Sequence, residues 1–454
     1  MNDTRRITII GGGASGTLLA VNLLQQSGDR PVSIDLIEKR ERVGRGVAFS
    51  TADECHLLNV PAAKMGAFPD DIEHFHGWLG ENNFEYAPSD FVPRKLFGRY
   101  LTEVFESAVN TNPSGSTFRL HNDEAVDIDL DSQPANVKLA SGSEIPPDKV
   151  VLAFGNFLPP HPSVANLDFV SAPKYFQDPW SAKVATEIAP DDTVLIIGTG
   201  LSMVDFLMRY HRSKHRGKIY AISTRGLLPA VHKLGYAYDS FIDEIRPMTR
   251  ITDILKAVRR HVASASADSS DWRAVIDSLR PHTQEIWLNL PTAEKKYFMQ
   301  HLSRYWNVSR HRMPAEAAAV VDEMQATGRL AVMKGRLKTI DWNGGKFNVG
   351  FASNGEIGGV ETNAVINCIG SESNFERLDS PLVKNLFAGG HIRNDSLSLG
   401  LDAAPDGTII DRNGSPSDRL FTLGTALKGV LWESTAIPEI RVQARALAEK
   451  LLAS

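Results

Sequence analysis

The sequence predicts an α/β protein with two Rossmann-like dinucleotide-binding domains and a helical insertion. An apolar strand runs into a glycine-rich turn and an apolar helix twice, at Ile7–Leu24 and at Asp191–Tyr210. A further strand follows each of these segments, as in the βαβ unit of a nucleotide-binding domain. A stretch with helical spacing, about 241–321, lies after the second unit.

Length and composition exclude several classes of protein. With 454 residues the chain predicts more than one domain, and 42% hydrophobic with 23% charged residues is typical of a globular protein. The net charge of −5 gives no reason to expect nucleic acid as a partner. The N-terminus has no apolar segment of signal-peptide length, and no run of 18 apolar residues follows. We therefore expect a cytoplasmic protein without a membrane partner.

The cysteines and histidines predict neither a redox dithiol nor a metal site. Cys55 and Cys368 lie far apart without CxxC spacing, which fits a reducing compartment. The spacing of His56, His74 and His76 matches no standard set of metal ligands.

The first glycine motif predicts a pyrophosphate site. Ile7–Ile10 reads as a buried strand, and the turn after it has GxGxxG spacing. The first glycine permits the tight turn, the second a close approach to the pyrophosphate, and the third close packing of the helix Thr17–Gln26 on the strand. The helix N-terminus supplies N–H groups and a positive dipole end. The expected contacts are Gly11, Gly13, Ala14, Ser15 and Gly16.

Glu38 indicates which dinucleotide this motif binds. The strand in Val32–Arg40 leads to Glu38, 22 residues after Gly16. A carboxylate there accepts hydrogen bonds from both ribose hydroxyls and disfavours a 2′-phosphate, so we expect FAD or NAD rather than NADP. Lys39 beside it is a further candidate contact. The alternative for Glu38 is a solvated charge at a strand end.

The second motif repeats the pattern with one departure. Val194–Ile197 forms the strand, Gly198, Thr199 and Gly200 form the turn, and Met203 stands where the third glycine is expected. Ser202 is expected to donate a hydrogen bond to the pyrophosphate.

The strand after the second motif ends in a base instead of an acid. Lys218–Thr224 is followed by Arg225, and an arginine at this place pairs with a 2′-phosphate and stacks on adenine. An exposed surface arginine is the alternative. We therefore expect NADPH rather than NADH in the second unit and FAD in the first.

Two further strand–glycine segments predict the domain order. They lie in Asp148–Pro160 and Asn363–Phe375, and such segments return the chain to the FAD domain beside the cofactor in two-dinucleotide flavoproteins. The expected domains are the first FAD part at 1–185, the NAD(P)H-binding domain with its insertion at 186–360, and the second FAD part at 361–454. Candidate cofactor contacts in these segments are Gly155, Asn156 and Gly370.

At this point the chain resembles the glutathione-reductase-like FAD/NAD(P) flavoproteins. More narrowly, it resembles the bacterial FAD-NAD(P)-binding family, distant relatives of flavin N-hydroxylating and Baeyer–Villiger monooxygenases. The resemblance covers most of the chain. The segments that carry it are Gly44–Thr51, His56–Leu79, Phe91–Leu101, Tyr175–Trp180, Arg304–Pro314 and Leu431–Ala448.

The resemblance implies contacts to FAD from several of these segments. The part around Asn59 and Met65 would contact the flavin or its ribityl chain. Arg45 and Arg94 would lie near the FAD phosphates or the active-site cleft.

The resemblance also gives the C-terminal segment a role. Gly424 would close a final strand, and the helix after Trp432, with Thr435 at its start, would point its N-terminus at the flavin pyrimidine ring. That positive end would stabilise negative charge on reduced flavin. Many relatives carry an aspartate after the glycine to bind the ribityl chain, whereas this chain has Thr425.

The insertion allows two interpretations. Its aromatic residues fill a small core of their own, or the insertion forms a lid over the substrate pocket. The lid interpretation places Arg304, Tyr305, Trp306, Arg310, His311 and Arg312 near the cleft. Arginines there would suit an anionic substrate. Together with Arg94, Arg304 and Trp306 are the candidate cleft residues.

The predicted function is that of an FAD-dependent, NAD(P)H-using oxidoreductase. Without CxxC a disulfide reductase is excluded. The favoured reaction is that of a monooxygenase, in which NADPH reduces FAD and a flavin C4a-(hydro)peroxide transfers oxygen from O₂ to a small molecule. The alternatives are a dehydrogenase or reductase with another electron acceptor, and a non-catalytic flavin-bound sensor. The chemistry is flavin-centred, so we predict no general acid or base. The sequence predicts neither the substrate nor the oligomeric state.

Overall fold

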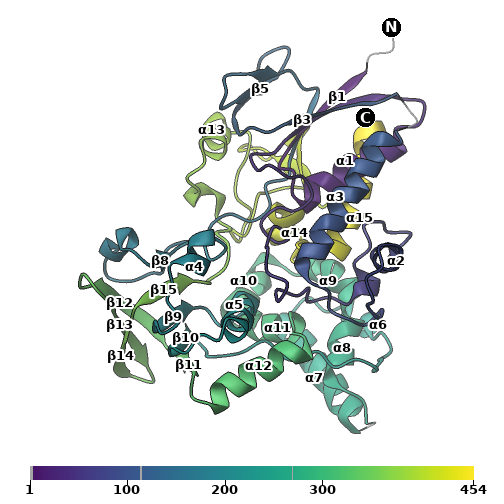
Figure 1. Ribbon diagram of the computed structural model, residues 1–454. Helices are drawn as coiled ribbons and strands as arrows, with labels where there is room; N and C mark the ends of the chain where they lie inside the picture. The colour runs from purple at the N-terminus through teal and green to yellow at the C-terminus, as the bar shows by residue number, and fades with distance from the viewer. Residues whose placement is uncertain (1–3, 113–114, 268, 454) are drawn as a thin grey trace.

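The computed structural model describes residues 4–112, 115–267 and 269–453 and confirms the predicted α/β fold class. Figure 1 shows one unit at the top, built around β1 and α1, and a second at the lower left, built around β9 and β10. The teal helices of the insertion lie below the first unit and beside the second.

The first unit is a mainly parallel sheet covered by long helices. Its strand order is β16–β17–β7–β1–β2–β3, with only β16 antiparallel to its neighbour within the described chain. Helices α1, α3 and α15 bury apolar side chains in one common core with β1 and β2. The bounds are β1 Arg5–Ile10, β2 Val32–Ile37, β3 Thr117–His121, β7 Lys149–Leu152, β16 Thr408–Ile410, β17 Pro416–Thr422, α1 Ala14–Gln26, α3 Arg94–Asn110 and α15 Ile437–Ala453.

The second unit is a parallel sheet in the order β11–β10–β9–β15–β8. The segment of β7 pairs with β1 in the first sheet, in agreement with its predicted return to the first domain. The segment of β15, however, lies in the second sheet between β9 and β8, so the chain returns to the first unit only after this strand. A short, fully buried apolar strand fits the centre of either sheet, and its pattern does not distinguish them. The bounds are β8 Tyr175–Phe176, β9 Val194–Ile197, β10 Ile219–Ser223, β11 Leu330–Lys334 and β15 Ala364–Asn367.

The insertion runs between β10 and β11 and has a core of its own. Side chains of α6, α7, α8, α9 and α10 gather around Trp287, together with Trp432 from the C-terminal segment. By contrast, α12 packs Val321 and Met324 into the core of the second sheet, beside α5. The bounds are α5 Leu201–Arg212, α6 Ile242–Ile245, α7 Ile251–Ala267, α8 Trp272–Ser278, α9 Thr283–Asn289, α10 Thr292–His301, α11 Ser303–Arg310 and α12 Ala315–Ala326.

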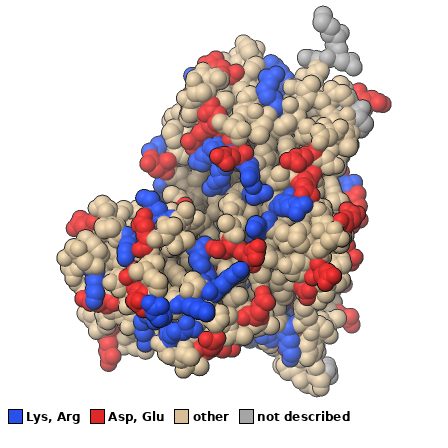
Figure 2. All heavy atoms as spheres, viewed as in Figure 1, with Lys and Arg blue, Asp and Glu red and all other residues tan. Residues whose placement is uncertain are grey.

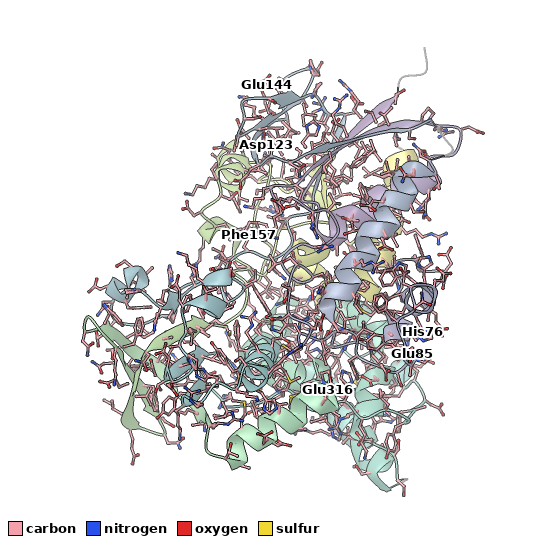
Figure 3. All side chains as sticks on the ribbon, in the orientation of Figure 1. His76, Glu85, Asp123, Glu144, Phe157 and Glu316 are labelled. Carbon is pink, nitrogen blue, oxygen red and sulfur yellow. The ribbon has the colours of Figure 1, made fainter. Side chains whose placement is uncertain are left out.

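Smaller elements decorate both units, and the sequence analysis did not predict the two antiparallel sheets. The strands β4–β6 extend the first unit, where Figure 3 labels Asp123 and Glu144, and β12–β14 extend the second. In the described part of the chain, no helix is long and apolar enough to cross a membrane. The remaining bounds are β4 Ala125–Asp129, β5 Asn136–Leu139, β6 Glu144–Ile145, β12 Arg336–Trp342, β13 Phe347–Ser353, β14 Glu356–Thr362, α2 His74–Glu81, α4 Ala182–Thr186, α13 Pro381–Gly389 and α14 Lys428–Leu431.

Two chain segments connect the units, one after β7 and one after β15, and these segments contact each other. Phe157, labelled in Figure 3 between the two units, contacts Phe375 of the other connection with ring centroids 5.4 Å apart. The Ser371 hydroxyl donates to the Phe157 carbonyl at 2.8 Å, and the Asn367 amide donates to the Pro160 carbonyl at 2.8 Å. Because these contacts tie the two connections together, they constrain the position of the second unit relative to the first.

Candidate active site between the two units

The first glycine turn is shaped for close approach of a ligand to the backbone. Gly11 has φ +109°, and a Cβ atom there would collide with the Ala153 carbonyl. A Cβ atom on Gly16 would collide with the Gly11 carbonyl, so the glycine lets α1 pack directly on the turn. The N-cap of α1 is Gly13, which has no side chain to bond the first N–H groups. These groups therefore remain available to an anion.

Glu38 lies at the edge of this turn, where the sequence places it. Its side chain is 8% exposed, one carboxylate oxygen accepts from the Gly12 N–H at 2.7 Å, and the other accepts from the Arg40 N–H at 2.9 Å. Each oxygen keeps lone pairs for a ribose hydroxyl. Lys39 instead contacts Glu124 at 3.0 Å in an exposed ion pair.

Arg45 brings positive charge to the region of the turn. Its Nε is buried with no hydrogen-bond partner in the described chain, and burial lowers the pKa of the guanidinium. The next residue, Gly46, approaches Gly13 closely, and Ser15 lies against Gly424. A helix N-terminus with an incompletely bonded guanidinium nearby fits a pyrophosphate group.

The C-terminal segment closes over this region. The Thr425 hydroxyl donates to the Gly155 carbonyl at 2.6 Å, and the Gly424 N–H donates to the Gln443 side chain at 2.8 Å. Thr425, which stands where relatives carry an aspartate, is thus used within the protein. Asn156 next to Gly155 is exposed.

The segment of Asn59 and Met65 lies close to the start of α15. Met65 is buried at 3% exposure, and Arg441 of α15 donates to the neighbouring Gly66 carbonyl at 2.9 Å. The Asn59 carbonyl accepts from His232 at 3.0 Å. The Ser434 hydroxyl, three residues before α15, is fully buried and has no hydrogen-bond partner among the described residues. An unbonded buried hydroxyl at this place fits a polar ring edge of a bound flavin.

The second turn repeats the first. Gly198 has φ +115°, and a Cβ atom there would collide with the Cys368 carbonyl just after β15. The corresponding Cβ atom on Gly11 would collide with the Ala153 carbonyl in the same way. Gly200 is the N-cap of α5, and open space lies where its Cβ would be. Thr199 is buried and donates to the Leu227 carbonyl at 2.6 Å. Gly370, two residues beyond Cys368, therefore belongs to the second turn's surroundings.

Met203 shows how the second turn tolerates a third position without glycine. The side chain is fully buried in the core of the second sheet. A side chain at this place requires more room between helix and strand than the glycine of the first motif does. The two phosphate-facing glycines are unaffected by this change.

A cavity of about 290 Å³ joins the second turn to the C-terminal segment. Gly200 and Ser202 line one side, α11 of the insertion lines another, and the segment before α15 lines a third. The complete lining is Gly200, Leu201, Ser202, Pro229, Asn307, Val308, His311, Lys428, Trp432, Glu433 and Thr435. Of these residues, the sequence analysis singled out only Gly200, Ser202, His311, Trp432 and Thr435.

Burial lowers the pKa of two basic groups that line the cavity. Burial lowers the pKa of His311 to about 3, so this imidazole is neutral at neutral pH. Burial also lowers the pKa of Lys428, which Glu433 opposes. Glu433 is 6% exposed, accepts from Trp306 Nε1 at 3.3 Å and faces Arg310 at 3.6 Å.

Trp432 holds a strained backbone conformation beside the cavity. Its φ is +62°, and the next N–H, of Glu433, donates to the Leu431 carbonyl at 2.8 Å. This three-residue γ-turn is rare for a residue with a side chain and is retained only where packing enforces it. The Trp432 ring stacks on Trp287 at 5.0 Å between centroids, so the insertion core holds the turn in place.

The candidate cleft residues are not gathered at one point. Arg94 pairs with Asp205 of α5 at 2.9 Å, and a parallel contact joins Arg209 of α5 to Asp53 at 2.6 Å. Burial raises the pKa of Asp205 to about 6, although Arg94 opposes this shift. Arg94 therefore connects the first unit to the helix that carries the second glycine turn.

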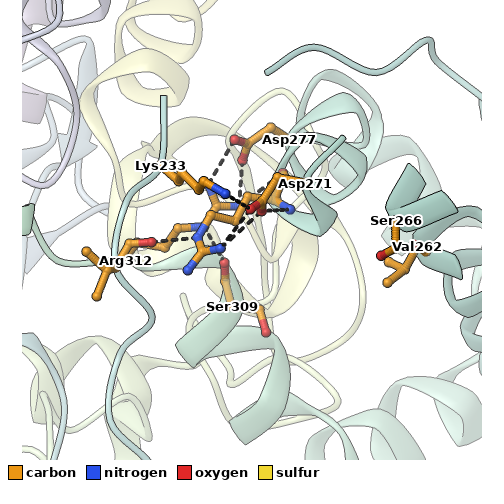
Figure 4. Close-up of polar contacts among 9 residues, drawn as sticks. Lys233, Val262, Ser266, Asp271, Asp277, Ser309 and Arg312 are labelled. Carbon is orange, nitrogen blue, oxygen red and sulfur yellow. Dashed lines mark hydrogen bonds and ion pairs between the residues drawn. The ribbon is translucent and has the colours of Figure 1, made fainter. Parts of the chain in front are cut away.

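Arg304 lies away from Arg94, in a second pocket that also contains Arg225. Figure 2 shows Lys and Arg side chains around the hollow between the units and again over the region of β10 and β11. Arg312, by contrast, is 2% exposed and bonds both oxygens of Asp277 at 2.9 Å. Figure 4 shows it among Ser309, Asp271 and Lys233 at the junction of the insertion helices.

The histidine cluster considered in the sequence is dispersed. His74 bonds the Tyr100 hydroxyl, and His56 is buried beside Trp180. His76, labelled in Figure 3 near Glu85, bonds the Tyr86 carbonyl. Across the described residues, no group of three or more His, Cys, Asp or Glu side chains is placed to hold a metal ion.

Two glycine turns, each at the carboxyl edge of a parallel sheet, define a fold with two dinucleotide-binding units. Residues 8–157 match a family model described as FAD-NAD(P)-binding. This match confirms, over that part of the chain, the resemblance predicted from the sequence. A comparison with curated protein sequences finds no match.

Solved structures share the fold over the full chain. The ornithine N-hydroxylase of Kutzneria sp. 744, described with reduced FAD, NADP⁺ and L-ornithine, is 12% identical with a TM-score of 0.63, covering 99% of both chains. The FAD-bound cadaverine monooxygenase of Erwinia amylovora is 12% identical with a TM-score of 0.68, covering 100% of this chain and 95% of that one. The thioredoxin reductase of T. acidophilum is 13% identical with a TM-score of 0.52, covering 99% and 98%. The shared fold thus includes both monooxygenases and a reductase.

Proposed function

We propose that this protein is an FAD- and NADPH-dependent monooxygenase that acts on a small molecule. The observation that carries the proposal is the cavity between the second glycine turn and the segment before α15, since it brings that turn, α11 and the C-terminal segment around one space. The N-hydroxylase and the cadaverine monooxygenase with the same fold support oxygen transfer to an amine-bearing substrate as the reaction class.

In this proposal the first unit binds FAD. The turn at Gly11–Gly16 and Arg45 hold the pyrophosphate, and Glu38 accepts from the ribose hydroxyls. Asn59, Met65 and the start of α15 would hold the flavin ring. The positive dipole end of that helix would stabilise negative charge on the ring.

The second unit binds NADPH. The turn at Gly198–Ser202 would hold the pyrophosphate, Arg225 would bind the 2′-phosphate, and the cavity beside Thr435 would take the nicotinamide. Bound flavin supplies the redox chemistry, accepting a hydride and reacting with oxygen.

The chain's own residues shape the reaction space. Trp432 and Val308 form apolar walls that exclude water, which protects reactive species from hydrolysis. Glu433, held by Arg310 and Trp306, offers a carboxylate to a cationic group of the substrate. The neutral His311 accepts or donates a hydrogen bond without adding positive charge that would repel such a group.

Stopped-flow absorbance tests the proposal. The holoprotein is reduced anaerobically with NADPH, or with dithionite as a control, and mixed with oxygen. We expect NADPH to bleach the flavin and oxygen to produce a transient spectrum unlike oxidised or reduced flavin. Direct return of the oxidised spectrum after both reductants would favour a reductase with another acceptor. Failure of NADPH to bleach the flavin would contradict the enzyme assignment and leave the sensor.

A further inference from the structure

We propose that Arg304, Lys334 and Arg336 complete, with Arg225, a site for the 2′-phosphate of NADPH, and that the insertion thereby selects the coenzyme. This inference rests on the proposed function, because it assumes that the second unit binds a nicotinamide dinucleotide. It adds three residues from two other parts of the chain to the one arginine that the motif predicts.

The pocket gathers four positive side chains from three places. Arg225 follows β10, Lys334 ends β11, Arg336 begins β12, and Arg304 comes from α11 of the insertion. The cavity measures about 270 Å³, and its remaining lining residues are Thr224, Gly335, Ala352, Ser353 and Asn354. The lining therefore contains no carboxylate.

The four cations lack anionic partners in the described chain. None of them forms a salt bridge within 4.0 Å; Arg304 donates to the Gln300 carbonyl at 3.2 Å, and Lys334 donates to the Asn354 side chain at 3.5 Å. All four side chains are exposed, and an anion bound between them would offset the repulsion among their charges that water and salt only partly screen. A phosphate monoester carries more than one negative charge at neutral pH. It therefore compensates the four positive charges better than a neutral ribose hydroxyl does.

The position of the pocket fits the adenosine end of the coenzyme. In the register of the second sheet Ser223 is opposite Lys334, so both strands deliver their C-terminal residues to one edge. Nucleotides bind at the carboxyl ends of strands in such sheets, and the residue after the second strand reads the ribose. Gly226 packs against Lys334, which brings Arg225 and Lys334 to the same rim.

One face of α11 connects this pocket with the reaction cavity. Arg304 lines the pocket, whereas Asn307 and Val308, at i+3 and i+4, line the cavity together with His311 just after the helix. The helix from Arg304 to Arg310 spans about 9 Å. The coenzyme would therefore lie between the second glycine turn and α11, with its phosphate end at Arg304 and its nicotinamide end at His311.

The test measures nucleotide binding by calorimetry on the FAD-loaded protein, without turnover. The probes are adenosine 2′,5′-bisphosphate and 5′-AMP, and the variants are Arg304→Ala, Lys334→Ala and Arg336→Ala. Lys338→Ala is the matched control, because Lys338 is an exposed lysine of β12 outside the pocket. Retained FAD absorbance checks that each variant is folded.

We expect the wild type to bind the 2′,5′-bisphosphate more tightly than 5′-AMP, by roughly tenfold or more. Each pocket variant should lose roughly three- to tenfold in affinity for the bisphosphate, with 5′-AMP unchanged and the control like wild type. If the wild type prefers the bisphosphate but the three variants behave like Lys338→Ala, the inference is overturned while the proposed function stands. If neither nucleotide nor NADP⁺ binds the wild type, the proposed function fails as well.

Discussion

At the level of single residues, Glu38 and Arg225 are the side chains that we propose distinguish the two cofactors. Both follow the strand after a glycine turn, and their opposite charges are suited to different riboses. Glu38 already has its carboxylate oriented by the Gly12 and Arg40 N–H groups. Orientation before binding lowers the cost of ordering the site when FAD arrives.

Replacing Glu38 should weaken FAD binding. In Glu38→Gln the amide keeps the shape but loses the charge, and a hydrogen bond to a charged group is worth about 1.5–3 kcal/mol. We expect the Kd for FAD to rise roughly tenfold or more in a fluorescence titration. Glu124→Gln removes an exposed carboxylate that contacts only the neighbouring surface and serves as the control. Equal Kd values for both variants would refute the ribose assignment.

Replacing Arg225 should change coenzyme preference. Arg225→Ala removes a charge that only NADPH uses, so KM for NADPH should rise roughly tenfold with little change for NADH. Steady-state rates of coenzyme oxidation measure both constants. A similar rise for both coenzymes would show that the arginine does not read the 2′-phosphate.

At the scale of elements, α5 is held to the first unit by two ion pairs. Asp205 pairs with Arg94, and Arg209 pairs with Asp53, so α3 and the loop before it contact the helix of the second turn. Asp205 is 6% exposed, and such buried pairs are costly to break because one charge is left without its partner.

Asp205 should make stability depend on pH. Burial raises its pKa to about 6, so between about pH 4 and pH 6 the folded state binds a proton that the unfolded state has released. Stability from this group therefore falls as pH rises through that window. In urea unfolding, the free energy of the wild type minus that of Asp205→Asn should be smaller at pH 7 than at pH 4.5. A larger difference at pH 7 would mean that Arg94 keeps the carboxylate ionised throughout.

Elements with regular patterns could be predicted, whereas contacts between distant segments could not. Gly11 and Gly198 allow their turns to be predicted from the sequence, because a positive φ and a close backbone approach require glycine. Lys334 and Arg336 carried no such signal; only the pairing of β10 with β11 brings them to Arg225. The sequence around Glu433 likewise indicates only an acidic residue shortly before a helix. In the structure Glu433 contacts Trp306 of α11 and lines the cavity. These sites depend on tertiary arrangement rather than on local spacing.

At the scale of the whole molecule, the two cofactor sites are built from segments far apart in the chain. The proposed FAD site combines the first turn, Gly155 after β7 and Gly424 after β17. The insertion reaches from the basic pocket to the reaction cavity through α11 and buries Trp432 in its core. Binding of either cofactor is therefore expected to stabilise contacts between units.

FAD should accordingly raise the melting temperature of the whole chain. A ligand that binds only the folded state adds about 2.7 kcal/mol at a free concentration of one hundred times its Kd. Thermal unfolding of the apoprotein, followed by circular dichroism with increasing FAD, measures this gain. A melting temperature that does not change with FAD would contradict the proposal that these distant segments together form an FAD site.

We propose that both cofactors meet in the cavity lined by Gly200, Asn307, His311 and Thr435. A crystal structure of the protein with FAD and NADP⁺ tests it most directly. We predict the flavin ring at the start of α15 and the nicotinamide in this cavity, in contact with the ring. A nicotinamide bound outside the cavity, or FAD bound at the Gly198–Gly200 turn, would contradict the account.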